Sequence, residues 1–117
     1  MVRVLVTITP RMYRQAIALS IHRQRPGLDV RTASPEATER ELTDFRPHLL
    51  VHNDTDGLGP EAAADIPCRI EVQYSDGMDA KISADGELST APDMCMEDLL
   101  RVVDVAIALA DRETDQS

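Results

Sequence analysis

The chain has very few aromatic residues: no tryptophan, two tyrosines and one phenylalanine among 117 residues. Its hydrophobic content is nevertheless 43%, which is enough for one compact core in a chain of this length. The core is therefore expected to be aliphatic, with valine, isoleucine, leucine, alanine and methionine as its main residues. We expect a single domain over residues 1–111 and a flexible polar tail over residues 112–117.

Long apolar runs and cysteine clusters are also missing. No stretch approaches the roughly 20 apolar residues of a membrane span, and the first residues lack the basic-then-apolar pattern of a secretory signal. Cys68 and Cys95 have no metal-ligand spacing, and two cysteines make a poor disulfide framework. These absences predict a cytoplasmic protein with free thiols, no metal, no cofactor and no membrane contact.

Positive charge is scarce in the second half of the chain. Residues 1–50 carry eight Lys/Arg against five Asp/Glu, a balance of +3. Residues 51–117 carry four Lys/Arg against sixteen Asp/Glu, a balance of −12. So acidic a surface repels phosphate backbones, and we therefore expect no direct binding to nucleic acid.

The first half predicts alternating strands and helices. Residues 2–7 are almost continuously apolar, which is typical of a parallel strand covered on both faces. Residues 10–25 have the spacing of an amphipathic helix, with an apolar face formed by Met12, Ala16 and Leu19, and with Ile17 and Ile21 beside it.

Two further strands and a second helix follow. Residues 28–32 and 49–52 are apolar enough for strands, and residues 35–45 between them predict a helix. Ser34 is the expected N-cap of that helix, with proline at the first helical position. Strand–helix units joined by such short connections favour a parallel sheet with right-handed crossovers.

The second half predicts a different arrangement. Residues 69–74 and 78–83 alternate polar and apolar side chains and are joined by Ser75-Asp76-Gly77, so they predict a β-hairpin. A short segment over residues 87–90 follows, and the final helix is expected to begin near Asp93. Its apolar face consists of Met96, Leu99, Leu100, Val103, Ile107 and Ala110.

Three motifs of the first half resemble response-regulator receiver domains. They are Val2-Arg3-Val4-Leu5-Val6, Pro10-Arg11-Met12-Tyr13-Arg14 and Arg46-Pro47-His48-Leu49-Leu50-Val51. The resemblance covers residues 2–56, with a weaker echo from Ala84-Asp85-Gly86 to Met96-Glu97-Asp98-Leu99-Leu100. It implies a three-layer α/β/α sandwich of the flavodoxin-like class, with strands ordered 2-1-3 followed by the fourth and fifth. The predicted hairpin region replaces the fourth helix of that fold.

The residues that receivers need for phosphorylation are absent at the matching positions. Thr7-Ile8-Thr9 stands where receivers have an acid pair, and Asn53 stands at the position of the phosphate-accepting aspartate. Ser89-Thr90-Ala91-Pro92 stands where a lysine should precede proline. Receivers hold a divalent metal with these acids during phosphoryl transfer. The resemblance therefore implies a pseudo-receiver, a non-enzymatic signal-transduction module that works through protein–protein contacts without phosphorylation.

Two features of the third strand leave alternatives open. A one-residue shift would bring Asp54 to the acceptor position, although Asn53-Asp54-Thr55-Asp56-Gly57 has the composition of a hydrophilic turn. The same stretch lacks the glutamate of a calcium loop. His48 and His52 lie four apart on one strand face, and we expect hydrogen-bonded core or rim residues rather than metal ligands.

A second functional hypothesis is a regulatory domain that binds a small ligand. Its site would lie at the carboxyl edge of the parallel sheet and would be lined by Thr7, Thr9, Asn53, Asp54 and Ser75. A small enzyme built on the same residues stays open, although the sequence offers no recognisable nucleophile and base.

The second half also predicts a homodimer. Soft apolar residues concentrate where the fourth helix is missing: Cys68, Met78, Met94, Cys95 and Met96. A two-fold partner would cover this exposed surface through the final helix or the edge hairpin.

Overall fold

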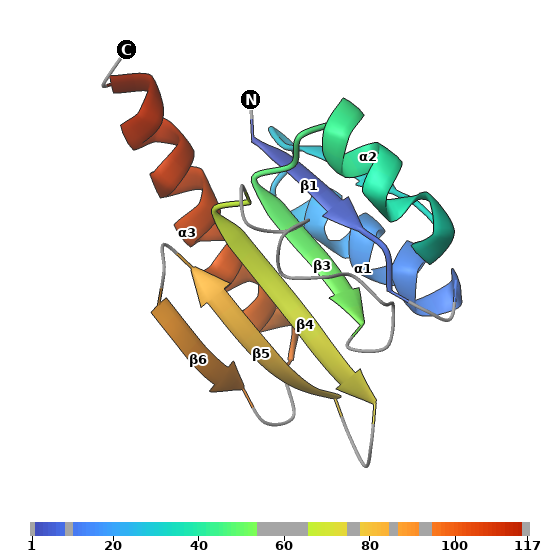
Figure 1. The fold of residues 1–117 in the computed structure, drawn as a ribbon. Helices are drawn as coiled ribbons and strands as arrows, with labels where there is room; N and C mark the ends of the chain where they lie inside the picture. Colours follow the sequence, from blue (N-terminus) through green and yellow to red (C-terminus); the bar gives the residue numbers. More distant parts are fainter. Residues whose placement is uncertain are drawn as a thin grey trace.

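The computed structural model describes residues 2–8, 11–53, 66–74, 78–84, 87–91 and 95–115. These residues form a mixed α/β fold, a six-stranded sheet with α-helices against both of its faces (Figure 1). The elements, in chain order, are β1 (Arg3–Val6), α1 (Arg11–Gln24), β2 (Asp29–Thr32), a 3₁₀ turn (Pro35–Ala37), α2 (Thr38–Asp44), β3 (Leu49–Asn53), β4 (Cys68–Tyr74), β5 (Met78–Ala84), β6 (Glu87–Ala91) and α3 (Met96–Asp115).

The sheet has the order β2-β1-β3-β4-β5-β6. β1 is parallel to β2 and β3, and β4 is parallel to β3. β5 and β6 each run antiparallel to the strand before them. The predicted order of the first five strands and the predicted hairpin are confirmed. The segment 87–90, expected only as a short piece, belongs to a sixth strand at the end of the sheet.

The hairpin explains why no helix separates the fourth and fifth strands. Only three residues lie between the end of β4 and the start of β5. A parallel crossover needs a dozen residues or more, so two strands joined this closely must pair antiparallel.

The two central strands are buried on both faces. In β1, Val4, Leu5 and Val6 are fully buried, and in β3 so are Leu49 and Leu50. Because successive side chains of a strand alternate between faces, each strand contributes to two separate apolar clusters. Aliphatic residues on both sides of a strand therefore require helices on both sides of the sheet.

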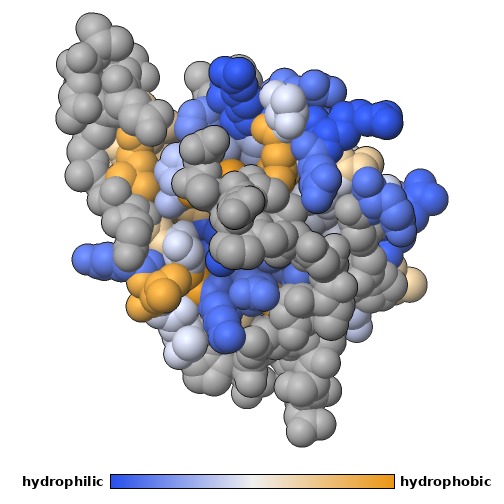
Figure 2. All heavy atoms as spheres, viewed as in Figure 1, coloured by the Kyte–Doolittle hydropathy of each residue, from blue (hydrophilic) through white to orange (hydrophobic). Residues whose placement is uncertain are grey.

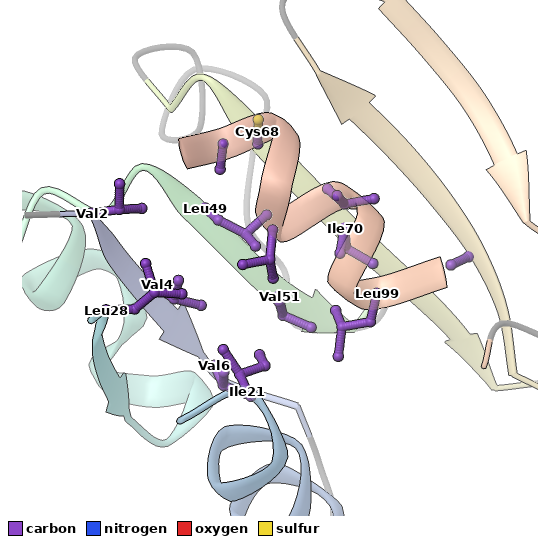
Figure 3. Packing of buried hydrophobic residues seen from close by; sticks show 14 of the residues in the cluster. Val2, Val4, Val6, Ile21, Leu28, Leu49, Val51, Cys68, Ile70 and Leu99 are labelled. Atoms are coloured by element: carbon purple, nitrogen blue, oxygen red, sulfur yellow. The ribbon is translucent and has the colours of Figure 1, made fainter. Parts of the chain in front are cut away.

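The larger cluster lies beneath α1 and α3. Val4 and Val51 of the sheet share it with Ile21 of α1 and Leu99 of α3 (Figure 3). The smaller cluster lies on the opposite face, where Leu5 and Leu50 contact Phe45 just after α2. α2 is amphipathic: one side of the helix faces this cluster, and hydrophilic side chains cover the side that faces solvent (Figure 2).

The buried side of α1 differs from the predicted one. Met12 is 75% exposed and Leu19 is 50% exposed, whereas Ile21 is fully buried and Ile17 is partly buried in the core. Both sets of residues have helical spacing, so periodicity alone does not distinguish them. The β-branched pair Ile17 and Ile21, one turn apart, faces the sheet, so the buried side is narrower than the broad apolar face predicted.

The start of α2 also differs from the prediction. The chain first forms the 3₁₀ turn, and Ala37 then occupies the N-cap position without a side-chain hydrogen bond. The predicted cap, Ser34, acts through its backbone instead, because its carbonyl accepts hydrogen bonds from Ala37 N–H and Thr38 Oγ1.

α3 begins at Met96 rather than near Asp93, and residues 92–94 lie outside the described residues. The Asp98 carboxylate accepts the backbone N–H of Cys95 at 3.3 Å, as in the reciprocal half of a capping box. Leu99 and Val103 of the predicted apolar face are buried. The helix continues to Asp115, four residues into the segment expected as a tail.

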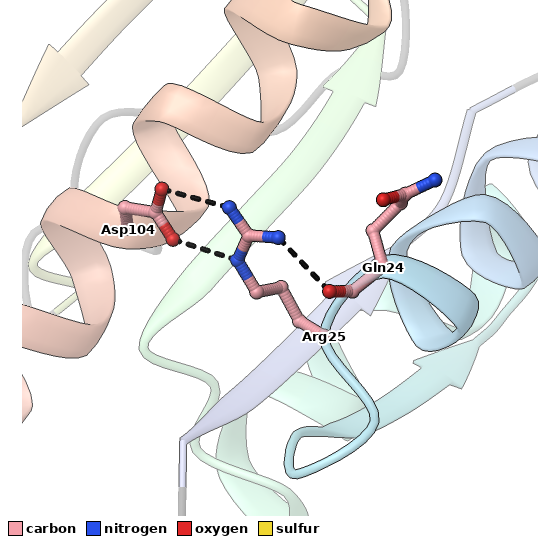
Figure 4. Close-up of polar contacts among 3 residues, drawn as sticks. All are labelled: Gln24, Arg25 and Asp104. Carbon is pink, nitrogen blue, oxygen red and sulfur yellow. Dashed lines mark hydrogen bonds and ion pairs between the residues drawn. The ribbon is translucent and has the colours of Figure 1, made fainter.

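A bidentate ion pair joins the end of α1 to α3. Arg25, just after α1, contacts the two carboxylate oxygens of Asp104 at 2.8 and 2.9 Å and also donates to the Gln24 carbonyl (Figure 4). The hydrogen bond from Arg25 lowers the pKa of the Asp104 carboxyl below its ordinary value. Because the pair is largely exposed to solvent, it positions the helices more than it stabilises them.

None of the helices in the described ranges combines the length and the apolarity that crossing a bilayer requires.

Two leucines test the core. Leu50→Ala removes a fully buried side chain between β3 and α2, and we expect a loss of roughly 2–5 kcal/mol in the free energy of unfolding. Leu19→Ala is the matched control, since Leu19 is 50% exposed on α1, and its effect should stay within about 0.5 kcal/mol. Denaturant unfolding followed by circular dichroism measures both. Equal losses in the two variants would contradict the described core.

Candidate functional site

The carboxyl ends of β1 and β3 lie side by side, and two neutral polar residues sit there. Thr7 follows β1, and Asn53 ends β3. Thr7 N–H donates to the Val51 carbonyl at 2.8 Å, and the Thr7 hydroxyl lies 3.4 Å from the same oxygen. Thr7 is fully buried, and Asn53 is 2% exposed. The residues at the predicted acid-pair and acceptor positions are therefore neighbours, and both are part of the interior.

These residues divide between the two faces of the sheet. Val6 lies beside Val51 in the parallel register of β1 and β3. If this register continues, the next residues, Thr7 and His52, lie beside each other. Ile8 and Asn53 then follow as the next pair. Thr7 and His52 follow the alternation of Leu5 and Leu50 and lie on the α2 face. Ile8 belongs to the cluster beneath α1 and α3, and Asn53 is on that face. Thr7 and Ile8 of the predicted pocket therefore face opposite sides of the sheet, and Thr9, its further member, is outside the described residues.

The two histidines make the hydrogen bonds expected of core and rim residues. His48 Nδ1 accepts the backbone N–H of Arg3 at 3.0 Å. His52 is 2% exposed, and its Nδ1 lies 3.0 Å from the Asn53 carbonyl oxygen. A carbonyl oxygen only accepts, so this ring nitrogen carries the hydrogen. The interpretation of both residues as hydrogen-bonded is confirmed. Within the described ranges, no three His, Cys, Asp or Glu side chains gather as a metal site would require.

The remaining predicted site residues lie elsewhere. Thr9, Asp54 and Ser75 are outside the described residues. Thr90 is on β6, three strands away from β3. At the usual strand spacing this is about 14 Å, so the structure does not bring Thr90 together with Asn53.

Thr90 instead borders a hollow between α3 and the last two strands. The hollow has a volume of about 460 Å³. Its lining consists of Ile82, Ala84, Ser89, Thr90, Asp98, Arg101, Val102 and Val105. Apolar, hydroxyl and charged groups alternate along it, which suits a polypeptide surface better than a small hydrophobic molecule.

β6 forms one edge of the described sheet beside this hollow. The four residues from Glu87 to Thr90 are all exposed, and Leu88, at 81%, is the most exposed large hydrophobic residue of the described part of the chain. The outer backbone groups of an edge strand are available for pairing with another strand. The sequence predicted an exposed edge in this half of the chain but did not identify residues 87–91 as that edge, because alternation identifies a strand but not its place in a sheet.

Comparison with known proteins does not identify a relative: no family model, no curated protein and no solved structure matches the chain.

The burial of Asn53 predicts the effect of restoring the acceptor carboxylate. Asn53→Asp should lower the free energy of unfolding by roughly 1–3 kcal/mol at pH 8, because an ionised carboxylate in this place loses its hydration. Burial raises the folded-state pKa of the new carboxyl above its unfolded value of about 4. The destabilisation by the buried charge is thus absent below the unfolded-state pKa, and it grows as the pH rises from there to the folded-state pKa.

Denaturant unfolding at pH 5 and pH 8 tests this, and the destabilisation should be smaller at pH 5. Asn53→Leu is the control, because a neutral side chain of similar size gives a destabilisation that is independent of pH. A pH-independent effect of Asn53→Asp would show that the position is accessible to water.

Proposed function

We propose that the chain is a receiver-like domain, a three-layer α/β/α sandwich of the flavodoxin-like class, that acts as a phosphorylation-independent interaction module. It has no enzymatic activity and works through protein–protein contacts. The observation that carries the proposal is Asn53, a neutral residue buried to 2% exposure at the end of the third strand, where receivers have their phosphate acceptor.

The neighbouring positions support the same conclusion. Phosphoryl transfer to a receiver needs an exposed carboxylate and a divalent cation held by oxygen ligands. Ile8, in the acid-pair segment, is fully buried and offers only hydrocarbon. Thr7 is also fully buried, and its hydroxyl is directed to the Val51 carbonyl. Neither residue can replace a carboxylate in charge or in exposure.

The strand order supports the receiver-like fold. β2, β1, β3 and β4 are parallel and adjacent, with α1 on one face and α2 on the other. The departure comes after β4, where a hairpin stands in place of a helix. Receiver-like domains commonly pair through the fourth and fifth strands and the final helix, and this is the region that the hairpin and β6 remodel.

The contact surface of the proposed module is the β6 edge with the adjoining hollow, and its partner is a second copy of the chain. β6 contains no lysine, arginine or proline, whereas the opposite edge, β2, carries Asp29 and Arg31 and is one residue shorter. Charged residues and short length are the usual means of blocking edge pairing. β6 has one charged residue, Glu87 at its first position, so it is the less protected edge of the described sheet.

The sequence of β6 is also compatible with pairing to itself. A two-fold axis through Ser89 in an antiparallel pair places Glu87 opposite Ala91 of the second copy, so the two glutamates are not cross-strand neighbours. Leu88 lies opposite Thr90, an aliphatic and β-branched contact that favours pairing. The symmetry buries the same five residues twice.

The absence of phosphorylation chemistry is tested with beryllofluoride and magnesium, which mimic a receiver's phosphorylated state. We expect the melting temperature to stay unchanged, because the acceptor position presents a buried carboxamide and not an accessible carboxylate. Differential scanning fluorimetry measures the shift, and an ordinary receiver in the same buffer is the positive control. A clear stabilisation would mean that another carboxylate, such as Asp54, serves as acceptor.

The proposed dimer is tested by placing a charge on the β6 edge. Wild-type protein should be dimeric at tens of micromolar by light scattering, and Leu88→Lys should shift it toward monomer by at least about tenfold in dissociation constant. Leu19→Lys is the matched control, since Leu19 is 50% exposed on α1, away from this edge. A monomeric wild type would refute the dimer, and equal effects of both variants would refute the assignment to β6.

A further inference from the structure

A second cavity lies on the other side of α3, between both long helices and the sheet. Its volume is about 130 Å³. It is lined by Ile8, Ile17, Val51, Val72, Cys95, Met96 and Leu99. These residues come from the ends of β1, β3 and β4, from the middle of α1 and from the start of α3. Figure 3 shows the side chain of Leu99 lying close to that of Val51, its neighbour in the lining.

The cavity occupies the place where open parallel sheets bind ligands. α1, which follows β1, covers one face of the sheet, and α2, which precedes β3, covers the other. Ligand sites in open parallel sheets typically lie beyond the carboxyl ends of the strands. Ile8 lies just beyond the carboxyl end of β1, and Val51 lies two residues before the end of β3. The position in the fold therefore points to a ligand independently of the lining.

The lining restricts the ligand to a neutral molecule with an apolar body. All seven side chains are aliphatic or sulfur-containing, and transferring an ion into such surroundings is costly without a partner. A carboxylate stands near the exposed rim: Cys95 Sγ lies 3.4 Å from Asp98 Oδ2. This carboxylate disfavours anions further. An engineered apolar cavity of roughly 150 Å³ binds benzene, so a ring of that size fits here.

One polar group borders the lining. Asn53 pairs with Val72 across β3 and β4, and it follows Val51 by two residues on the same face. Its carboxamide therefore lies next to two of the lining side chains. Asn53 is 2% exposed and is not among the described lining residues, so the cavity holds its ligand by apolar contact.

We propose that this cavity is a binding site for a small neutral molecule with an apolar body about the size of a benzene ring. This goes beyond the interaction function, because the cavity shares no lining residue with β6 or with the hollow beside it. It also differs from the ligand site predicted from sequence, since Thr7 lies on the opposite face.

The test is a titration of the full chain with benzyl alcohol, benzene and benzoate, followed by methyl NMR. We expect saturable shifts of the Ile8, Val51, Val72 and Leu99 methyl groups with benzyl alcohol and with benzene. Benzoate should bind at least about tenfold more weakly, since its charge must be desolvated. Shifts that do not saturate, or that lie outside the lining, would overturn the proposal, as would equal binding of benzoate.

Val72→Phe places a ring in the cavity and should weaken benzyl alcohol binding by about tenfold or more. Val105→Phe is the matched control, because Val105 is 38% exposed on α3 and lines only the other hollow. Equal binding by the two variants would overturn the proposal.

Cys95 gives a second measurement that needs no core substitution. Benzyl methanethiosulfonate should label exposed Cys95 and leave buried Cys68 unmodified in the native protein. The attached benzyl group should then exclude benzyl alcohol from the cavity, and unchanged binding after labelling would contradict the assignment. Failure of either test leaves the dimer and the beryllofluoride result unaffected, so this site and the interaction function are judged separately.

Discussion

The structure depends on the burial of β1 and β3 on both of their faces. Val4, Leu5, Leu49 and Leu50 are all fully buried, and alternation sends neighbours in each strand to opposite sides. One layer of helices cannot cover both faces of either strand. α1 and α3 must cover one face and the segment around Phe45 the other. The 130 Å³ cavity lies on the first of these faces, where Ile17 of α1 and Leu99 of α3 meet Val51 of β3.

The same constraint favours neutral side chains at the ends of the central strands. Thr7, Ile8 and Asn53 continue these strands into the interior, and their exposure is 2% or less. A carboxylate in any of these places would lose its hydration without a metal or a cation to compensate. Neutral side chains and deep burial therefore go together at these three positions.

Much of the fold follows from local patterns, whereas the binding surfaces do not. Continuous and alternating apolar runs predicted the strands and the hairpin, because strand period and connection length are local properties, whereas the strand order was implied by the resemblance to receivers. The apolar face of α1 was predicted too broadly, since Met12 and Leu19 have the same helical spacing as Ile17 and Ile21. Ser34 was misassigned as a cap because a 3₁₀ turn comes first. The cavity joins Ile8, Val72 and Leu99, which are far apart in sequence, so no local pattern reveals it.

α3 connects the two proposed sites. Its first turns place Met96 and Leu99 in the lining of the cavity, and Asp98 and Arg101 in the lining of the hollow beside β6. One stretch of helix therefore forms a wall of each site. Farther along, Arg25 at the end of α1 contacts Asp104 of α3. Any ligand that displaces the first turns changes the shape of both walls, whereas Val72 belongs to the cavity alone. A substitution at Val72 therefore acts on the β6 surface only through the position of α3.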